Sequence, residues 1–88
     1  MYQLFLTAYQ KLNADERVII NDMVDGVSVQ AMAERLGKRP STVYSYRRDI
    51  YARVGIFGPD KLRQLRVLVT LMRREQEEQG LAPSQENP

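Results

Sequence analysis

The sequence predicts an all-α protein, a small bundle of four to five helices that contains a helix-turn-helix. Apolar residues recur at helical spacing in successive segments. Residues that favour helix starts precede these segments, and glycines follow them. Two of the segments are short and are joined by a tight turn containing Gly37, which is the pattern of a helix-turn-helix. The 88 residues allow one domain with one modest core.

The first two predicted helices precede this motif. Phe5, Ala8 and Tyr9 lie at helical spacing, so residues 1–11 are expected to form an extra N-terminal helix. Asn13, followed three residues later by Glu16, is a capping box and predicts the start of a second helix.

The helix-turn-helix itself is expected to begin at Ser28, a residue that favours helix starts. The short helix after Ser28 would bury Met32 and Leu36 and would end at Gly37. Pro40 suits the first position of the next helix, which should run from about residue 40 to residue 54.

This second helix of the motif has two unlike faces. Val43, Ile50 and Val54 share one face at spacings of seven and four. A group of mostly polar side chains falls on the opposite face at about 100° per residue. The group consists of Ser41, Tyr44, Ser45, Arg48 and Ala52. The apolar face would seat the helix on the bundle and leave the polar face free.

A long last helix is expected from about Asp60 to Gln79. Together with the preceding elements it would complete a helix-turn-helix domain over residues 12–79. Residues 80–88 contain two prolines and no periodic apolar residues, so we expect a disordered tail there.

The composition argues against an enzyme. The chain has no cysteine and no histidine, so it lacks thiolate and imidazole ligands as well as the commonest general base. We therefore expect no metal site and no cofactor. Residues 1–11 form neither a signal peptide nor a membrane span, which predicts a cytoplasmic protein without a membrane partner.

Positive charge is concentrated in the middle of the chain. Residues 35–74 hold 11 Lys or Arg and two acids, a net charge of +9, whereas the whole chain carries only +2. A basic segment between acidic ends is typical of proteins that bind a polyanion.

The stretch from Leu12 to Leu65 resembles the DNA-binding domain of LuxR/FixJ-type bacterial regulators. The matching residues are Leu12, Asn13, Glu16, Asp25-Gly26-Val27-Ser28, Met32-Ala33-Glu34-Arg35-Leu36, Thr42-Val43, Ile50, Val54-Gly55-Ile56 and Leu62. The resemblance implies four helices, of which the second and third form the helix-turn-helix and the fourth contributes to dimers. Five residues depart from the family pattern, so the base preference does not carry over: Ala31, Lys38, Arg39, Tyr44 and Tyr46.

The sequence thus predicts a stand-alone, sequence-specific transcription regulator that binds double-stranded DNA and is nucleoid-associated when bound. The residues expected to contact bases are Ser41, Tyr44, Ser45 and Arg48. The residues expected to contact phosphates are Lys38, Arg39, Thr42 and Arg53.

The last helix is expected to make the protein a homodimer, because it is apolar on two sides. The predicted interface consists of Leu65, Val67, Leu68, Leu71 and Met72. An alternative is that the N-terminal helix folds back through Phe5 and Tyr9 and covers the second side within one chain.

Two other functions fit the same sequence. Region four of sigma factors shares the Leu-Gly turn and the following Thr-Val, and would bind RNA polymerase. The long last helix and the extra N-terminal helix also suit an antagonist that heterodimerises with a larger regulator. Polymerase binding would favour the first of these, and partner binding without DNA affinity would favour the second.

Overall fold

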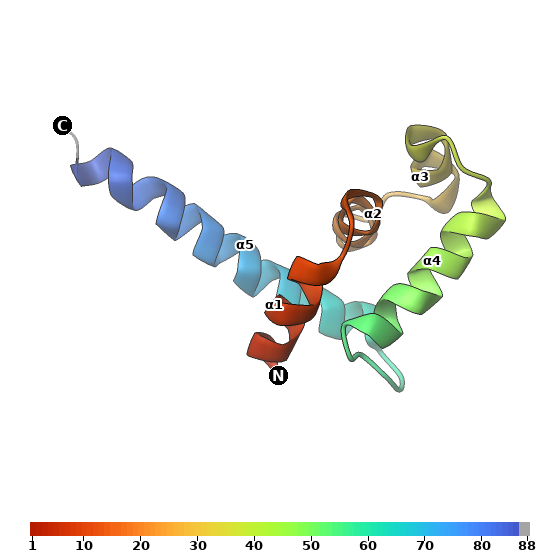
Figure 1. The fold of residues 1–88 in the computed structure, drawn as a ribbon, viewed down its shortest axis with the longest axis horizontal. Coiled ribbons are helices and arrows are strands. Elements are labelled where there is room, and N and C mark those ends of the chain that lie inside the picture. Colours follow the sequence, from red (N-terminus) through yellow and green to blue (C-terminus); the bar gives the residue numbers. More distant parts are fainter. Residues whose placement is uncertain (87–88) are drawn as a thin grey trace.

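A computed structural model describes the backbone of residues 1–86 and the side chains of residues 1–79. The described residues form five helices and no strand, which confirms the predicted small helical bundle. The helices are α1 (Tyr2–Lys11), α2 (Ala14–Val24), α3 (Val29–Leu36), α4 (Pro40–Arg53) and α5 (Lys61–Glu86), as shown in Figure 1.

The helix starts agree with the sequence. The side chain of Asn13 accepts a hydrogen bond from the Glu16 N–H at 2.9 Å, and Glu16 Oε1 accepts one from the Asn13 N–H at 3.0 Å. Ser28 Oγ accepts the Ala31 N–H at 3.1 Å. These bonds satisfy N–H groups that a helix start leaves without partners. α4 has no such cap and begins with Pro40, whose ring already fixes a helical φ.

The turn between α3 and α4 depends on Gly37. This residue has φ +65°, in the left-handed region where any side chain is strained. Beyond it, the Lys38 N–H donates to the Ala33 carbonyl at 2.9 Å and closes the end of α3. The turn is therefore tight, and it sets the direction in which α4 leaves α3.

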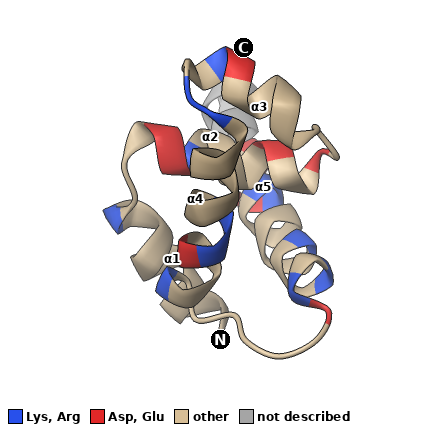
Figure 2. Cartoon of the chain, turned by 90° about the vertical axis from the view of Figure 1, so that its right-hand side faces the viewer, with Lys and Arg blue, Asp and Glu red and all other residues tan. Residues whose placement is uncertain are grey.

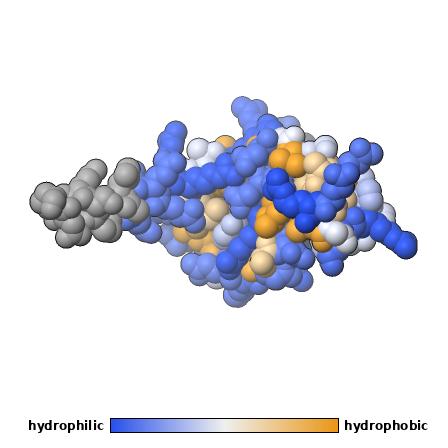
Figure 3. Space-filling model, turned by 90° about the horizontal axis from the view of Figure 1, so that it is seen from above, coloured by the Kyte–Doolittle hydropathy of each residue, from blue (hydrophilic) through white to orange (hydrophobic). Residues whose placement is uncertain are grey.

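The core draws on all five helices, and α2 lies at its centre. α2 contacts α3, α4 and α5, and in Figure 1 it lies between the α3–α4 pair and the first part of α5. The fully buried side chains include Phe5, Ile19, Ile20, Met32, Val43, Ile50, Ile56, Leu65 and Val69. The surface seen in Figure 3 is largely hydrophilic, with hydrophobic residues in small groups.

The N-terminal helix folds back onto α5. Phe5 is only 1% exposed, Tyr9 packs against the core, and the Tyr2 hydroxyl donates to Glu75. This is the packing that the alternative to a dimer predicted for α1. α1 does not cover all of α5, however, because Val67 remains 56% exposed and Leu71 40% exposed.

The predicted dimer interface needs a correction. Leu65, Leu68 and Met72 are at most 5% exposed, because they face α2 and α1 within the same chain. They are therefore core residues and are not available to a second subunit. Val67 and Leu71 are the members of the predicted interface that stay exposed.

α5 is also longer than expected. It extends to Glu86, whereas the sequence predicted its end at Gln79 and a disordered tail over 80–88. The backbone stays helical through Gly80 and Pro83, although both residue types disfavour the interior of a helix. Residues 87–88 of the predicted tail lie outside the described residues.

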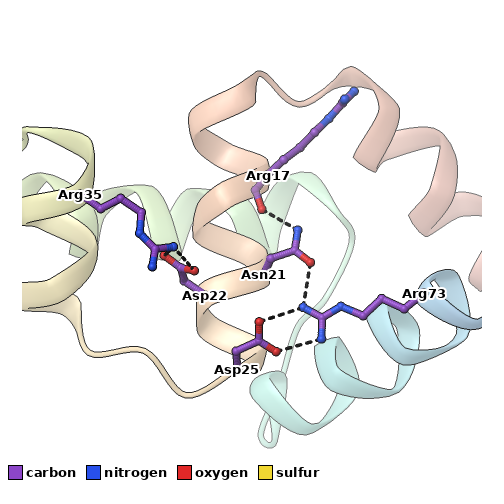
Figure 4. A network of polar contacts seen from close by, with 6 residues as sticks. All are labelled: Arg17, Asn21, Asp22, Asp25, Arg35 and Arg73. Carbon is purple, nitrogen blue, oxygen red and sulfur yellow. Dashed lines mark hydrogen bonds and ion pairs between the residues drawn. The ribbon is translucent and has the colours of Figure 1, made fainter. Parts of the chain in front are cut away.

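A network of polar contacts fastens α3 and α5 to α2 (Figure 4). The Arg73 guanidinium donates to Asp25 Oδ1 at 2.9 Å, to Asp25 Oδ2 at 3.1 Å and to Asn21 Oδ1 at 2.9 Å. The hydrogen bonds from Arg73 hold the pKa of Asp25 below its ordinary value. On the other side of α2, Arg35 Nη1 donates to both oxygens of the buried Asp22, at 2.8 and 3.0 Å.

Candidate nucleic-acid interface

One face of α4 is packed and the other is open. Val43 and Ile50 are completely buried, and Tyr46 packs partly against the core. Ser41, Tyr44, Arg48 and Ala52 are exposed on the opposite side. Figure 2 looks onto this side of the molecule, where basic positions occur on α4 and on the first part of α5. The open face of α4 is the candidate interface.

The four residues predicted to contact bases lie together on this face. The Tyr44 ring is 60% exposed, and Ser41 is also exposed, one turn before Ser45. Ser45 is half-buried, and its Oγ donates to the Ser41 carbonyl at 3.2 Å. That bond uses the hydroxyl proton, so the Ser45 oxygen is left as an acceptor for a donor on a ligand.

Arg48 is the longest side chain on the open face. Its Nε lies 3.5 Å from Asp49 Oδ1, and the two side chains are 78% and 61% exposed. An ion pair as exposed and as long as this contributes little. The guanidinium is therefore free to turn toward a ligand with its full set of donors.

The residues predicted to contact phosphates divide into two groups. Lys38 and Arg39 are exposed in the turn before α4, and Thr42 is half-buried in its first turn. Neither Lys38 nor Arg39 forms an ion pair with a described carboxylate. These three residues lie together at the N-terminal end of the open face.

Arg53 does not belong with them. Its Nη1 donates to Glu16 Oε2 at 2.6 Å, and the Glu16 side chain is only 11% exposed. Arg53 also lies 12 residues beyond Ser41, about 18 Å along the helix axis. The prediction of a phosphate contact missed this partner because the two residues are 37 positions apart in the sequence.

The structure adds functional candidates that the sequence analysis did not select. The Arg47 guanidinium lies 5.9 Å from the centre of the Tyr44 ring, and Lys61 Nζ lies 5.9 Å from the centre of the Tyr51 ring. Spacing alone could have placed Arg47 beside both tyrosines, since it follows Tyr44 by three residues and precedes Tyr51 by four. The contribution of Lys61 depends on how α5 crosses α4.

Two features are absent from the part of the chain with described side chains, a membrane-spanning helix and a metal-binding group of residues. None of its helices combines the length and the apolar character that crossing a membrane requires. Within the same residues, no three His, Cys, Asp or Glu side chains are grouped so as to hold a metal ion.

Comparisons with known proteins add no further guide. No family model, no curated protein and no solved structure matches the chain. Three features of the molecule therefore bear on its function: the α3–turn–α4 geometry, the exposure of the outer α4 face and the charge around that face.

Proposed function

We propose that this protein is a sequence-specific DNA-binding transcription regulator, similar to LuxR-type regulators, that inserts α4 into the major groove. One observation carries the proposal. The outer face of α4 is polar and uncovered, while Val43 and Ile50 on its inner face are completely buried. A recognition helix needs this division, because it must be held rigidly from behind and remain open in front.

The dimensions and chemistry of α4 suit a major groove. A helix with its side chains is about 10–12 Å wide, and the major groove is about 12 Å wide. Arg48 can donate two parallel hydrogen bonds to the O6 and N7 atoms of guanine. Ser41 and Tyr44 offer hydroxyl groups near it that can donate to or accept from base edges, and the Ser45 oxygen can accept from a donor on a base.

Charge at the start of α4 supports the same orientation. Lys38 and Arg39 are exposed and lie just before the helix, where they can contact phosphates at the edge of the groove. Such contacts fix position and register but carry no sequence information.

A homodimer is part of the proposal, with a smaller interface than the sequence suggested. The exposed Val67 and Leu71 on α5 are the apolar residues that a symmetry mate would cover. A twofold dimer would present two copies of α4 to successive turns of the major groove and would read a pseudo-palindromic site. In this proposal the protein works in the cytoplasm and is nucleoid-associated when bound.

The same exposed pair favours one other function. Val67 and Leu71 would also suit an antagonist that heterodimerises with a larger regulator. Such a protein would retain partner binding and show no affinity for DNA. A domain like region four of sigma factors is the other alternative function. Stable association of the protein with core RNA polymerase would favour it.

Selection of bound fragments from a random DNA pool tests the proposal and supplies the site. On the selected duplex, Arg48→Ala should lose about 1–3 kcal/mol of binding free energy and relax preference at one base position. Arg74→Ala, an exposed arginine in α5, is the control and should keep the preference. Equal losses for Arg48→Ala on matched and scrambled duplexes would make Arg48 a phosphate contact, and absence of selection would reject the function.

A further inference from the structure

Arg47, Lys61 and Arg66 lie near Tyr51, where the end of α4 approaches the start of α5. Lys61 Nζ lies 5.9 Å from the centre of the Tyr51 ring. Burial raises the pKa of the Tyr51 phenol, and the nearby positive charges of Arg47 and Arg66 oppose that rise. Three cations from two helices thus lie near one half-buried ring, and Arg47 also lies 5.9 Å from the centre of the Tyr44 ring. We call Arg47, Lys61 and Arg66 the α4–α5 basic cluster.

No carboxylate among the described side chains neutralises the positive charge of this cluster. Lys61 and Arg66 are exposed and Arg47 is half-buried. Other arginines of the fold are paired, such as Arg53 with Glu16 and Arg73 with Asp25. The cluster is therefore available to an anionic ligand.

The two flanks of α4 differ in charge. At about 100° per residue, Arg47 and Tyr51 lie on the flank that continues into the basic start of α5. The opposite flank carries Arg53, which Glu16 neutralises, and the exposed Asp49. A helix that fills a major groove has a phosphate backbone along each flank. Phosphates should therefore bind more strongly on the Arg47 side.

We propose that the α4–α5 basic cluster is a second DNA contact, which grips the phosphate backbone along one wall of the groove that α4 enters. This inference rests on the proposed function and adds a contact outside the recognition face. It makes the footprint asymmetric about α4. It also turns the start of α5 toward DNA, while Val67 and Leu71 on the next turns remain available to a partner.

The arrangement favours a duplex backbone over a single small anion. The cations come from two helices and lie near one exposed stretch of surface rather than on a single loop or helix end. Arg47 also lies over Tyr44, so the cluster is continuous with the face proposed to read bases. A ligand that contacts both must be extended and repetitively charged, as a nucleic acid backbone is.

The test compares two double variants that remove the same charge. Lys61→Ala with Arg66→Ala removes two cations of the cluster. Lys11→Ala with Arg74→Ala removes two exposed cations elsewhere and is the matched control. Binding to the selected duplex and to a scrambled duplex is measured across about 50–200 mM salt, and circular dichroism verifies that both variants fold.

The cluster variant should lower the slope of log binding constant against log salt concentration by about two. Its loss of affinity relative to the wild-type protein should therefore be roughly tenfold larger at about 50 mM salt than at about 200 mM salt. The loss should be similar on both duplexes, and hydroxyl-radical protection should disappear at one edge of the site only. The control should keep the wild-type slope and footprint. The double variant Lys61→Arg with Arg66→Lys keeps both charges and should bind DNA as the wild-type protein does.

Failure of this inference is distinct from failure of the proposed function. If the wild-type protein binds with a steep salt slope that the cluster variant leaves unchanged, the second contact is refuted and the recognition helix stands. An equal loss in the control would also refute the contact, since it would show an effect of net charge alone. Wild-type protein without DNA affinity would refute both.

Discussion

Glu16 joins the start of α2 to the end of α4, and its substitution gives a quantitative test of the structure. Glu16 Oε1 accepts the Asn13 N–H at 3.0 Å, and Glu16 Oε2 accepts Arg53 Nη1 at 2.6 Å. The carboxylate is 11% exposed, whereas the Arg53 side chain is 58% exposed. Loss of Arg53 would therefore leave a shielded carboxylate without a cation, whereas loss of the Glu16 charge would leave an arginine that water can solvate.

This inequality sets the order of the expected losses in the free energy of unfolding. Glu16→Gln keeps an acceptor for Asn13 and releases an arginine that water can solvate, so we expect a loss of about 0.5–1 kcal/mol. Arg53→Met leaves a shielded carboxylate without its cation, so we expect about 1–2 kcal/mol. Glu16→Ala also removes the capping bond and should cost about 1.5–2 kcal/mol in total.

Urea denaturation at neutral pH measures all three variants, and the double variant Glu16→Gln with Arg53→Met closes a thermodynamic cycle. A larger loss for Glu16→Gln than for Arg53→Met would refute the burial argument. DNA binding gives an independent check, because Arg53→Met should keep the wild-type salt slope. A slope lowered by about one, with stability unchanged, would restore Arg53 as a phosphate contact.

Two further predictions concern α5. The hydrogen bonds from Arg73 lower the pKa of Asp25 in the folded protein. These bonds therefore stabilise the fold above the ordinary pKa of 3.8, and the stabilisation is lost as the pH falls through the lowered pKa. Arg73→Met should therefore lower the denaturation midpoint at pH 7 and do so much less near pH 2; an equal difference at both pH values would contradict this. Leu71→Glu should shift the protein toward monomer in sedimentation equilibrium at micromolar concentration, with Thr70→Glu as a neighbouring control. A wild-type protein that is already monomeric would exclude the dimer.

Local signals in the sequence were sufficient for much of the fold. The capping box of Asn13 and Glu16, the Ser28 cap, the turn at Gly37 and the start at Pro40 all depend on residues within a few positions of one another. Burial of Val43 and Ile50 also follows from spacing on a single helix. Local chemistry therefore fixed the boundaries of α2, α3 and the start of α4.

Contacts between distant helices could not be obtained in this way. The sequence made Arg53 a candidate phosphate contact, but helical spacing could not show that Glu16 lies beside it. The same limit explains Leu65, Leu68 and Met72, which spacing identified as apolar without showing which helix covers them. The position of Lys61 and Arg66 near Tyr51 depends on how α5 is placed against α4. Only the proximity of Arg47 to Tyr51 could be predicted from their spacing on one helix.

The length of α5 has a consequence for how firmly its parts are held. Among the described side chains of α5, Met72 is the last buried one, and every side chain from Arg74 to Gln79 is exposed, as the helix extends away from the bundle in Figure 1. Amide hydrogens near Leu68 and Val69 should exchange with solvent only when the whole domain unfolds, whereas those at residues 76–79 should exchange through local opening. A partner that covers α5 near Val67 and Leu71 would move the boundary between these two regimes toward the C-terminus. Hydrogen exchange along this one helix would thus report on assembly, residue by residue, without any label on the partner.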